Sequence, residues 1–183
     1  GGTLDANNNL TLSGVLSHTA DITIDVAENK TLTYSGTAIN VGANTITLSG
    51  GGSFVSGGMT LNDAQSKLLL NSITLDSAST SANSLGLDVD ETSTVTSLTV
   101  GHTTPVYIAD GKTLSGGVAV TAGSIKLYET GTLASTVSMS GGTLVANESS
   151  TLSGALTNSG NFEIGVAEDK TLSYSGAAVN LGA

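Results

Sequence analysis

The chain has 183 residues, a formal net charge of −10 and an isoelectric point of about 4.2. Its five basic residues are all lysine, which argues against nucleic-acid binding, because that binding depends on Lys and Arg neutralising phosphates. The lack of cysteine excludes disulfides and thiolate metal sites. No stretch approaches the roughly 18 apolar residues of a membrane span, and Gly1 to Leu4 do not form a signal peptide, so we expect any export signal upstream.

The amino-acid composition is unusual for a globular domain. Aromatic residues make up 3% of the chain, tryptophan is absent, and 24 residues are glycine. Because large apolar side chains are so few, the chain can bury enough surface only if its small residues stack in regular rows. Disorder is the competing interpretation of such a composition. It is disfavoured because apolar residues alternate with polar ones, as in segments 22–26 and 70–75.

Short strands separated by turns are expected along the whole chain. Gly, Asn and Asp clusters mark the turns. The clearest strand candidates are Ile22–Val26, Ala38–Val41, Val95–Val100, Val118–Val120 and Ser124–Leu127. No long amphipathic helix is expected, and Asp63–Leu70 is the best local candidate for one or two helical turns.

A long repeat organises these elements. Residues 1–43 align with residues 141–183 without a gap, and 25 of the 43 positions are identical. We interpret residues 1–183 as a single β-solenoid segment in which 1–140 form one repeat block and 141–183 begin the next.

A shorter phrase recurs inside this block. Val26–Gly36 reappears as Val166–Gly176, and its centre reappears at 109–116. The repeated motif residues are Lys30, Thr31, Leu32, Tyr34 and Gly36, then Lys112, Thr113 and Leu114, then Lys170, Thr171, Leu172, Tyr174 and Gly176.

The pattern of the phrase predicts a role for each position. Apolar positions such as Leu32 alternate with threonines, so one set faces inward, and we place Leu172 in the inner stack. The residue before each lysine forms a corner. Each lysine then opens the next strand on its solvent side, where it can pair with the neighbouring acid and discourage lateral strand addition. Such an exposed pair is worth about 0–1 kcal/mol. A basic ligand site is the less favoured interpretation.

The spacing of the units decides the fold class. Comparable units recur about 20 residues apart, as from Thr11 to Thr31 and from Thr151 to Thr171. A β-propeller blade repeats at about 40 residues with aromatic signatures that this chain lacks. We therefore predict an all-β chain, a right-handed parallel β-helix of roughly 20–25 residues per coil and about 8 coils.

Few side chains suggest a chemical site. His18 and His102 are the only histidines, and we interpret both as loop residues. Asp88, Asp90 and Glu91 form the densest acidic group and are a weak candidate for Ca²⁺, although a solvated turn is favoured because no EF-hand or β-roll pattern surrounds them. We expect no other cofactor.

The missing residue types argue against an enzyme. Many β-helix proteins are polysaccharide lyases or hydrolases. A lyase usually uses Arg or Lys as base and for substrate neutralisation, and this chain has no arginine. A hydrolase needs paired carboxylates in a cleft and usually aromatic platforms for sugar rings, and aromatics are scarce.

Two segments carry a family resemblance. Thr151–Gly160 and Ile46–Phe54 resemble the repetitive passenger regions of bacterial autotransporters and related giant surface adhesins. The resemblance implies a right-handed β-helical stalk, export to the bacterial surface or the extracellular space, and a role in adhesion, aggregation or matrix. The repeat block of residues 1–140 is longer than the usual short repeats of such regions.

Three functional hypotheses follow. The first is a structural and interaction module, an adhesin stalk of a large extracellular repeat protein. The second is a self-assembling filament subunit that stacks through uncapped β-helix ends. The third is a polysaccharide-binding or polysaccharide-degrading β-helix. The expected partners are neighbouring repeats of the chain or other copies of it, and host or environmental glycans or proteins.

Overall fold

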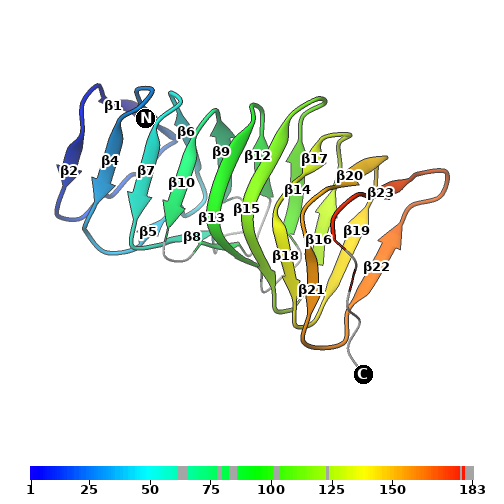
Figure 1. Cartoon of the computed structure of the whole chain (residues 1–183). Coiled ribbons are helices and arrows are strands. Elements are labelled where there is room, and N and C mark those ends of the chain that lie inside the picture. The colour runs from blue at the N-terminus through cyan, green and yellow to red at the C-terminus, as the bar shows by residue number, and fades with distance from the viewer. Residues whose placement is uncertain are drawn as a thin grey trace.

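Short parallel strands wind into a rod in the computed structural model of the chain (Figure 1). The structure describes residues 1–61, 66–77, 80–82, 86–100, 104–122, 124–177 and 179. These residues contain no helix, and hence none that could cross a membrane. The strands form one sheet of 9 strands and one of 14.

The strands of each sheet follow one another along the rod. The nine-stranded sheet has the order β1 (Gly2–Ala6), β3 (Ile22–Val26), β6 (Thr45–Ser49), β9 (Lys67–Asn71), β12 (Gly86–Val89), β14 (Thr104–Ile108), β16 (Ser124–Leu127), β19 (Thr143–Ala146) and β22 (Glu163–Val166). The main path of the second sheet is β2 (Leu10–Leu12), β4 (Thr31–Tyr34), β7 (Ser53–Ser56), β10 (Thr74–Ser77), β13 (Ser93–Val100), β15 (Thr113–Val120), β17 (Thr132–Leu133), β20 (Ser150–Leu152) and β23 (Leu172–Tyr174). Beside it lie β5 (Ile39–Asn40), β8 (Met59–Leu61), β11 (Thr80–Ala82), β18 (Thr136–Met139) and β21 (Leu156–Asn158).

The winding is that of a parallel β-solenoid. In Figure 1, β4, β7 and β10 run downwards in front, β6 and β9 run upwards behind, and the chain advances from left to right, so the coil is right-handed. Partners in the nine-stranded sheet lie between 19 residues apart, as Leu68 and Leu87, and 24 apart, as Ile22 and Ile46. The prediction of a parallel β-solenoid with about 8 turns of about 20 residues is confirmed.

Apolar ladders fill the interior of the rod. Alternate residues of each strand point inward, so one position per coil stacks on the same position of the next coil. One ladder of the nine-stranded sheet includes Ile22, Ile46, Leu68, Leu87, Val106, Leu127 and Ala146. All but Ile22, in the second coil, are at most 2% exposed. Burying each aliphatic side chain contributes about 1.5–3 kcal/mol, which explains how a chain with few aromatics holds together.

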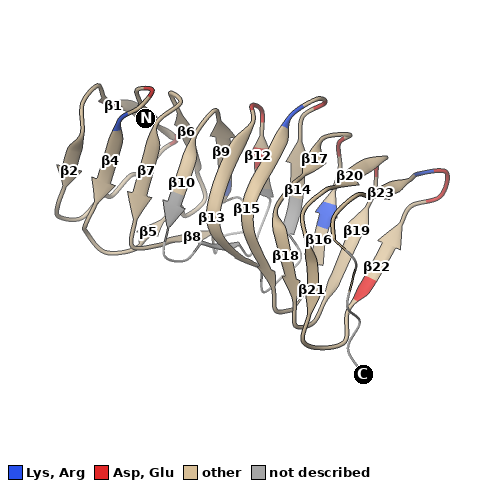
Figure 2. Cartoon of the chain, in the orientation of Figure 1, with Lys and Arg blue, Asp and Glu red and all other residues tan. Residues whose placement is uncertain are grey.

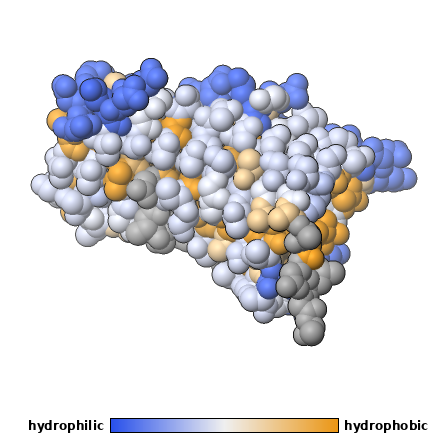
Figure 3. Space-filling model, in the orientation of Figure 1, coloured by the Kyte–Doolittle hydropathy of each residue, from blue (hydrophilic) through white to orange (hydrophobic). Residues whose placement is uncertain are grey.

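Many of the outward positions carry small polar residues. In β6 the outward residues are Thr45, Thr47 and Ser49, and Figure 3 shows a pale surface, neither strongly hydrophobic nor strongly hydrophilic, over much of the visible side of the rod.

The local strand predictions at Ile22–Val26 and Ser124–Leu127 are confirmed as β3 and β16. The helical turn considered for Asp63–Leu70 is wrong where the structure describes it, because residues 67–70 belong to β9. There Leu68 and Leu70 are buried and pair in register with β6, so inter-coil pairing prevails over local helix preference. Residues 62–65 lie outside the described part of the chain.

Four strands recur in the two aligned segments, residues 1–43 and 141–183, whereas β21 has no counterpart at residues 16–18. Strands β19, β20, β22 and β23 stand where β1, β2, β3 and β4 stand in the first repeat. The register is also the same: Leu4 pairs with Ile24, and Leu144 pairs with Ile164.

We predict that inward and outward neighbours on one strand differ sharply in their tolerance of charge. Val137 is fully buried and the adjacent Ser138 is exposed. Val137→Asp should cost several kcal/mol of unfolding free energy, because it leaves an unpaired charge in the apolar stack. The matched control Ser138→Asp should stay within about 0.5 kcal/mol. Denaturant unfolding measures both, and equal midpoints would show that Val137 does not face the interior.

Candidate functional site: the repeated corner and its acidic edge

A tight turn connects the two sheets in each copy of the repeated phrase. The Lys30 N–H donates to the Ala27 carbonyl at 3.0 Å, and Asn29 between them has a φ of 60°. The same bond joins Lys112 to Ala109 at 2.9 Å and Lys170 to Ala167 at 3.1 Å. The corner residues there are Gly111, with φ 69°, and Asp169, with φ 58°. Asn, Gly and Asp occupy this position because they tolerate the left-handed backbone conformation best.

The threonine after each lysine joins its coil to the preceding coil. The Thr31 N–H donates to Asn9 Oδ1 at 2.9 Å. In the other two copies, Thr113 N–H donates to Thr92 Oγ1 and Thr171 N–H to Ser149 Oγ, both at 3.2 Å. A polar side chain of the coil before therefore satisfies a backbone donor at the corner, where the strand ladder has not yet begun.

The leucine and tyrosine of the phrase face the interior. Leu32 and Tyr34 are 2% exposed and Leu114 is 1% exposed. Leu172 packs against the core but is only partly buried, because no coil of the described chain covers β23.

The tyrosine hydroxyl fixes the loop of the preceding coil. Tyr34 Oη donates to the Gly14 carbonyl at 3.0 Å and accepts from the Leu16 N–H at 2.9 Å. The equivalent Tyr174 accepts from the Leu156 N–H at 3.3 Å and donates to the Ala177 carbonyl. The glycine two residues later has no room for a side chain: a Cβ on Gly36 would lie 1.9 Å from the Gly14 carbonyl oxygen.

Two of the three lysines of the phrase pair with acids, but not with the acid beside them in sequence. Lys112 Nζ lies 2.6 Å from Glu91 Oε2, and Lys170 Nζ lies 2.6 Å from Glu148 Oε2, in each case on the preceding coil. The prediction that each lysine pairs with its neighbouring acid is therefore wrong for these two. In both copies the stacking of coils sets the lysine against an acid of the coil before.

The first copy of the phrase differs in this respect. Asn8 stands at the repeat position of Glu148. No carboxylate lies within ion-pair distance of Lys30 in the described part of the chain.

Many of the acidic residues lie along one edge of the rod. Figure 2 shows them at the corners along its upper edge, interrupted by lysines. Within the described ranges, no group of three or more His, Asp or Glu side chains could hold a metal ion.

The calcium candidate residues point to different partners. Asp88 projects from β12 and forms an ion pair with Lys67, whereas Glu91 pairs with Lys112 on the next coil. Asp90 lines a hollow of about 310 Å³ together with Lys67, Asp88, Tyr107 and Glu129.

The Lys67–Asp88 pair has an electrostatic consequence. The hydrogen bond to Asp88, supported by the charges of Asp88 and Asp90, outweighs partial desolvation and raises the pKa of Lys67 above its ordinary value of 10.5.

Two tyrosines beside this hollow were missed by sequence reasoning. The rings of Tyr107 and Tyr128 stack with centroids 5.1 Å apart and planes at 19°. Tyr107 lies on β14, and Tyr128 directly follows the paired strand β16. Their spacing of 21 residues, one coil, is the signal that could have found them.

No protein-family model, curated protein or solved structure matches this chain.

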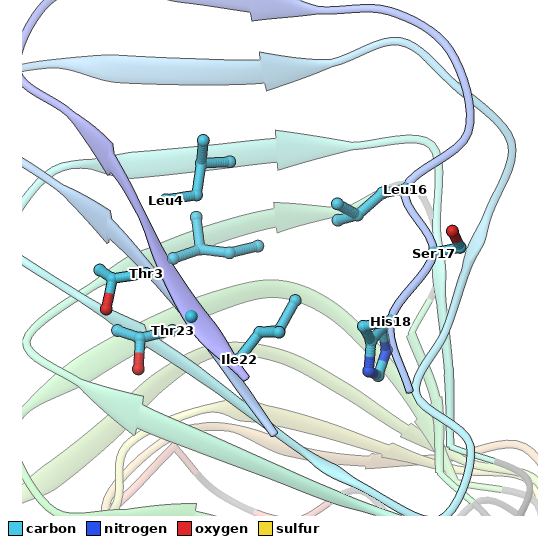
Figure 4. A pocket seen from close by; sticks show the side chains of 9 residues that line it. Thr3, Leu4, Leu16, Ser17, His18, Ile22 and Thr23 are labelled. Atoms are coloured by element: carbon cyan, nitrogen blue, oxygen red, sulfur yellow. The ribbon is translucent and has the colours of Figure 1, made fainter. Parts of the chain in front are cut away.

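His18 lies at the N-terminal mouth of the rod. Its Nδ1 is 3.2 Å from the Ala20 carbonyl oxygen, and it lines a hollow of about 180 Å³ with Leu4, Leu16 and Ile22 (Figure 4). His102 lies outside the described residues.

We predict that the corner at Gly111 is limited by backbone conformation alone. A Cβ at Gly111 would meet no atom within 4 Å, but its φ of 69° disfavours alanine. Gly111→Ala should therefore cost about 1 kcal/mol. Gly111→Asn, which introduces the residue of the Asn29 corner, should cost clearly less. Equal losses in denaturant unfolding would show that φ is not the cause.

We also predict a pH-dependent contribution from Lys67. A raised pKa means that the ion pair stabilises the fold fully below pH 10.5 and loses this effect as pH rises through the higher pKa of the folded chain. Lys67→Met should cost about 0–1 kcal/mol near neutral pH, and this difference from the wild type should shrink above pH 10.5.

The control for this titration is Lys126→Met, because Lys126 forms no ion pair in the described part of the chain. Its cost measures the loss of a lysine that has no ion partner, and it is subtracted from the Lys67→Met cost at each pH. A Lys67→Met difference that is constant across the titration would contradict the assignment.

Proposed function

We propose that this chain is part of the stalk of a large extracellular repeat protein, and that its role is reach and display rather than turnover of a substrate. The observation that carries this proposal is the unbroken interior ladder, which continues from coil to coil through the nine-stranded sheet. Each added coil lengthens such a rod by about 4.8 Å without a new core or a new topology. The resemblance to bacterial surface adhesins supports a location on a cell surface.

The surface of the rod fits this role. Outward threonines and serines keep the strand faces hydrated, and the net charge of −10 makes rods repel one another along their sides. The inter-coil pairs Lys112–Glu91 and Lys170–Glu148 tie successive corners together.

One observation favours a second candidate function, contact with polysaccharide. The stacked Tyr107 and Tyr128 lie beside a hollow that carries the carboxylates of Asp88, Asp90 and Glu129. Aromatic rings and carboxylates are the groups that stack on sugar rings and accept hydrogen bonds from their hydroxyls.

The stalk proposal is tested on the cells that make the protein. An antibody against this chain should label intact, unlysed cells and should detect a polypeptide far larger than 18.0 kDa by intact mass or denaturing gel. A native polypeptide near 18.0 kDa would favour the filament subunit instead. Labelling that appears only after lysis would contradict a surface stalk.

A further inference from the structure

Strands β22 and β23 are exposed at one end of the rod, but their sequences match those of strands that are covered inside it. They are the repeat equivalents of β3 and β4. Ile24 and Val26 on β3 are 0% exposed, whereas the identical residues Ile164 and Val166 on β22 are 44% and 45% exposed. Tyr34 is 2% exposed and its equivalent Tyr174 is 37% exposed. Similar strands therefore differ in burial because one pair is covered and the other is not.

The structure shows what covers the first pair. Strands β6 and β7 lie on β3 and β4 in a defined register, with Leu48 opposite Ile24 and Phe54 opposite Leu32. Two backbone hydrogen bonds join the covering corner to the corner beneath it. Gly52 N–H donates to the Val26 carbonyl and Ser53 N–H donates to the Lys30 carbonyl, both at 2.9 Å.

The covering segment needs glycine at its own corner. A Cβ on Gly50 would lie 2.4 Å from the Val26 carbonyl oxygen, and a Cβ on Gly52 would lie 2.5 Å from that of Ala27. The contacted positions recur on the open edge as Val166 and Ala167. Backbone atoms cannot move aside as a flexible side chain can, so this contact selects among covering segments.

We propose that the β22–β23 edge is a docking surface for residues 44–61 of a further copy of the repeat block. In the docked arrangement the Leu48 position lies opposite Ile164, the Phe54 position lies opposite Leu172, and the glycines of the covering corner lie on Val166 and Ala167. This inference rests on the proposed stalk and specifies how one block joins the next.

The first coil of a second molecule, formed by β1 and β2, would be a poor partner for the β22–β23 edge. A second molecule stacked end to end would present β1 and β2, whose corner is Asn7–Asn9 instead of three glycines. Strand β19, the repeat equivalent of β1, is preceded in its sheet by β16. Leu144, the equivalent of Leu4, is covered by Ile125 of β16, whereas Leu4 itself is 36% exposed at the mouth in Figure 4.

The test extends the chain in register. Ala183 is the repeat equivalent of Ala43, so a chain continued after Ala183 with the sequence of residues 44–61 joins without a gap. Hydrogen exchange followed by mass spectrometry should show the amides of β22 and β23 exchanging about tenfold more slowly than in the unextended chain. The melting temperature should rise with it.

Two matched extensions of the same length serve as controls. One carries the sequence of residues 1–18, and the other carries 44–61 with Gly50→Asn and Gly52→Ala in the added copy only. Both should leave exchange at β22 and β23 unchanged. Equal protection by all three would show that the edge accepts any strand pair, and no protection by the 44–61 extension would overturn the proposal. Either result leaves the cell-surface test of the stalk unaffected.

Discussion

Parallel pairing between coils about 20 residues apart is the constraint on which this structure depends. A single coil cannot bury its inward side chains, because the ladder positions above and below it belong to other coils. Ile46, Leu68 and Leu87 are each enclosed by residues that follow or precede them by one turn of the chain. Small side chains suffice because every ladder repeats the same contact, and large aromatic residues are not needed to fill a central volume.

The corners are where this pairing is most demanding. Each corner must reverse the chain and still lie against the corner of the neighbouring coil. Left-handed residues such as Asn29 make the reversal, and side chains such as Asn9 satisfy donors that the ladder leaves unpaired. Several charged residues also lie at the corners, and stacking sets Lys112 against Glu91 of the preceding coil.

Burial in this molecule is a property of position along the rod as much as of sequence. Tyr34 and Tyr174 occupy equivalent positions in the repeat, yet only the first is enclosed. The covered strands inside the 140-residue repeat therefore show which contacts its exposed end strands can make once another coil covers them. This is the physical basis for regarding the rod as a unit that extends by adding coils.

Much of the fold follows from the sequence alone, because period and alternation are local properties. The recurrence of the Val26–Gly36 phrase and the alternation around Leu32 were sufficient to predict a parallel solenoid and its turn length. The partner of each lysine and the stacking of Tyr107 on Tyr128 were not predictable in this way. Those contacts join residues about 21 positions apart, and coil lengths between 19 and 24 residues leave the register open until the coils are stacked.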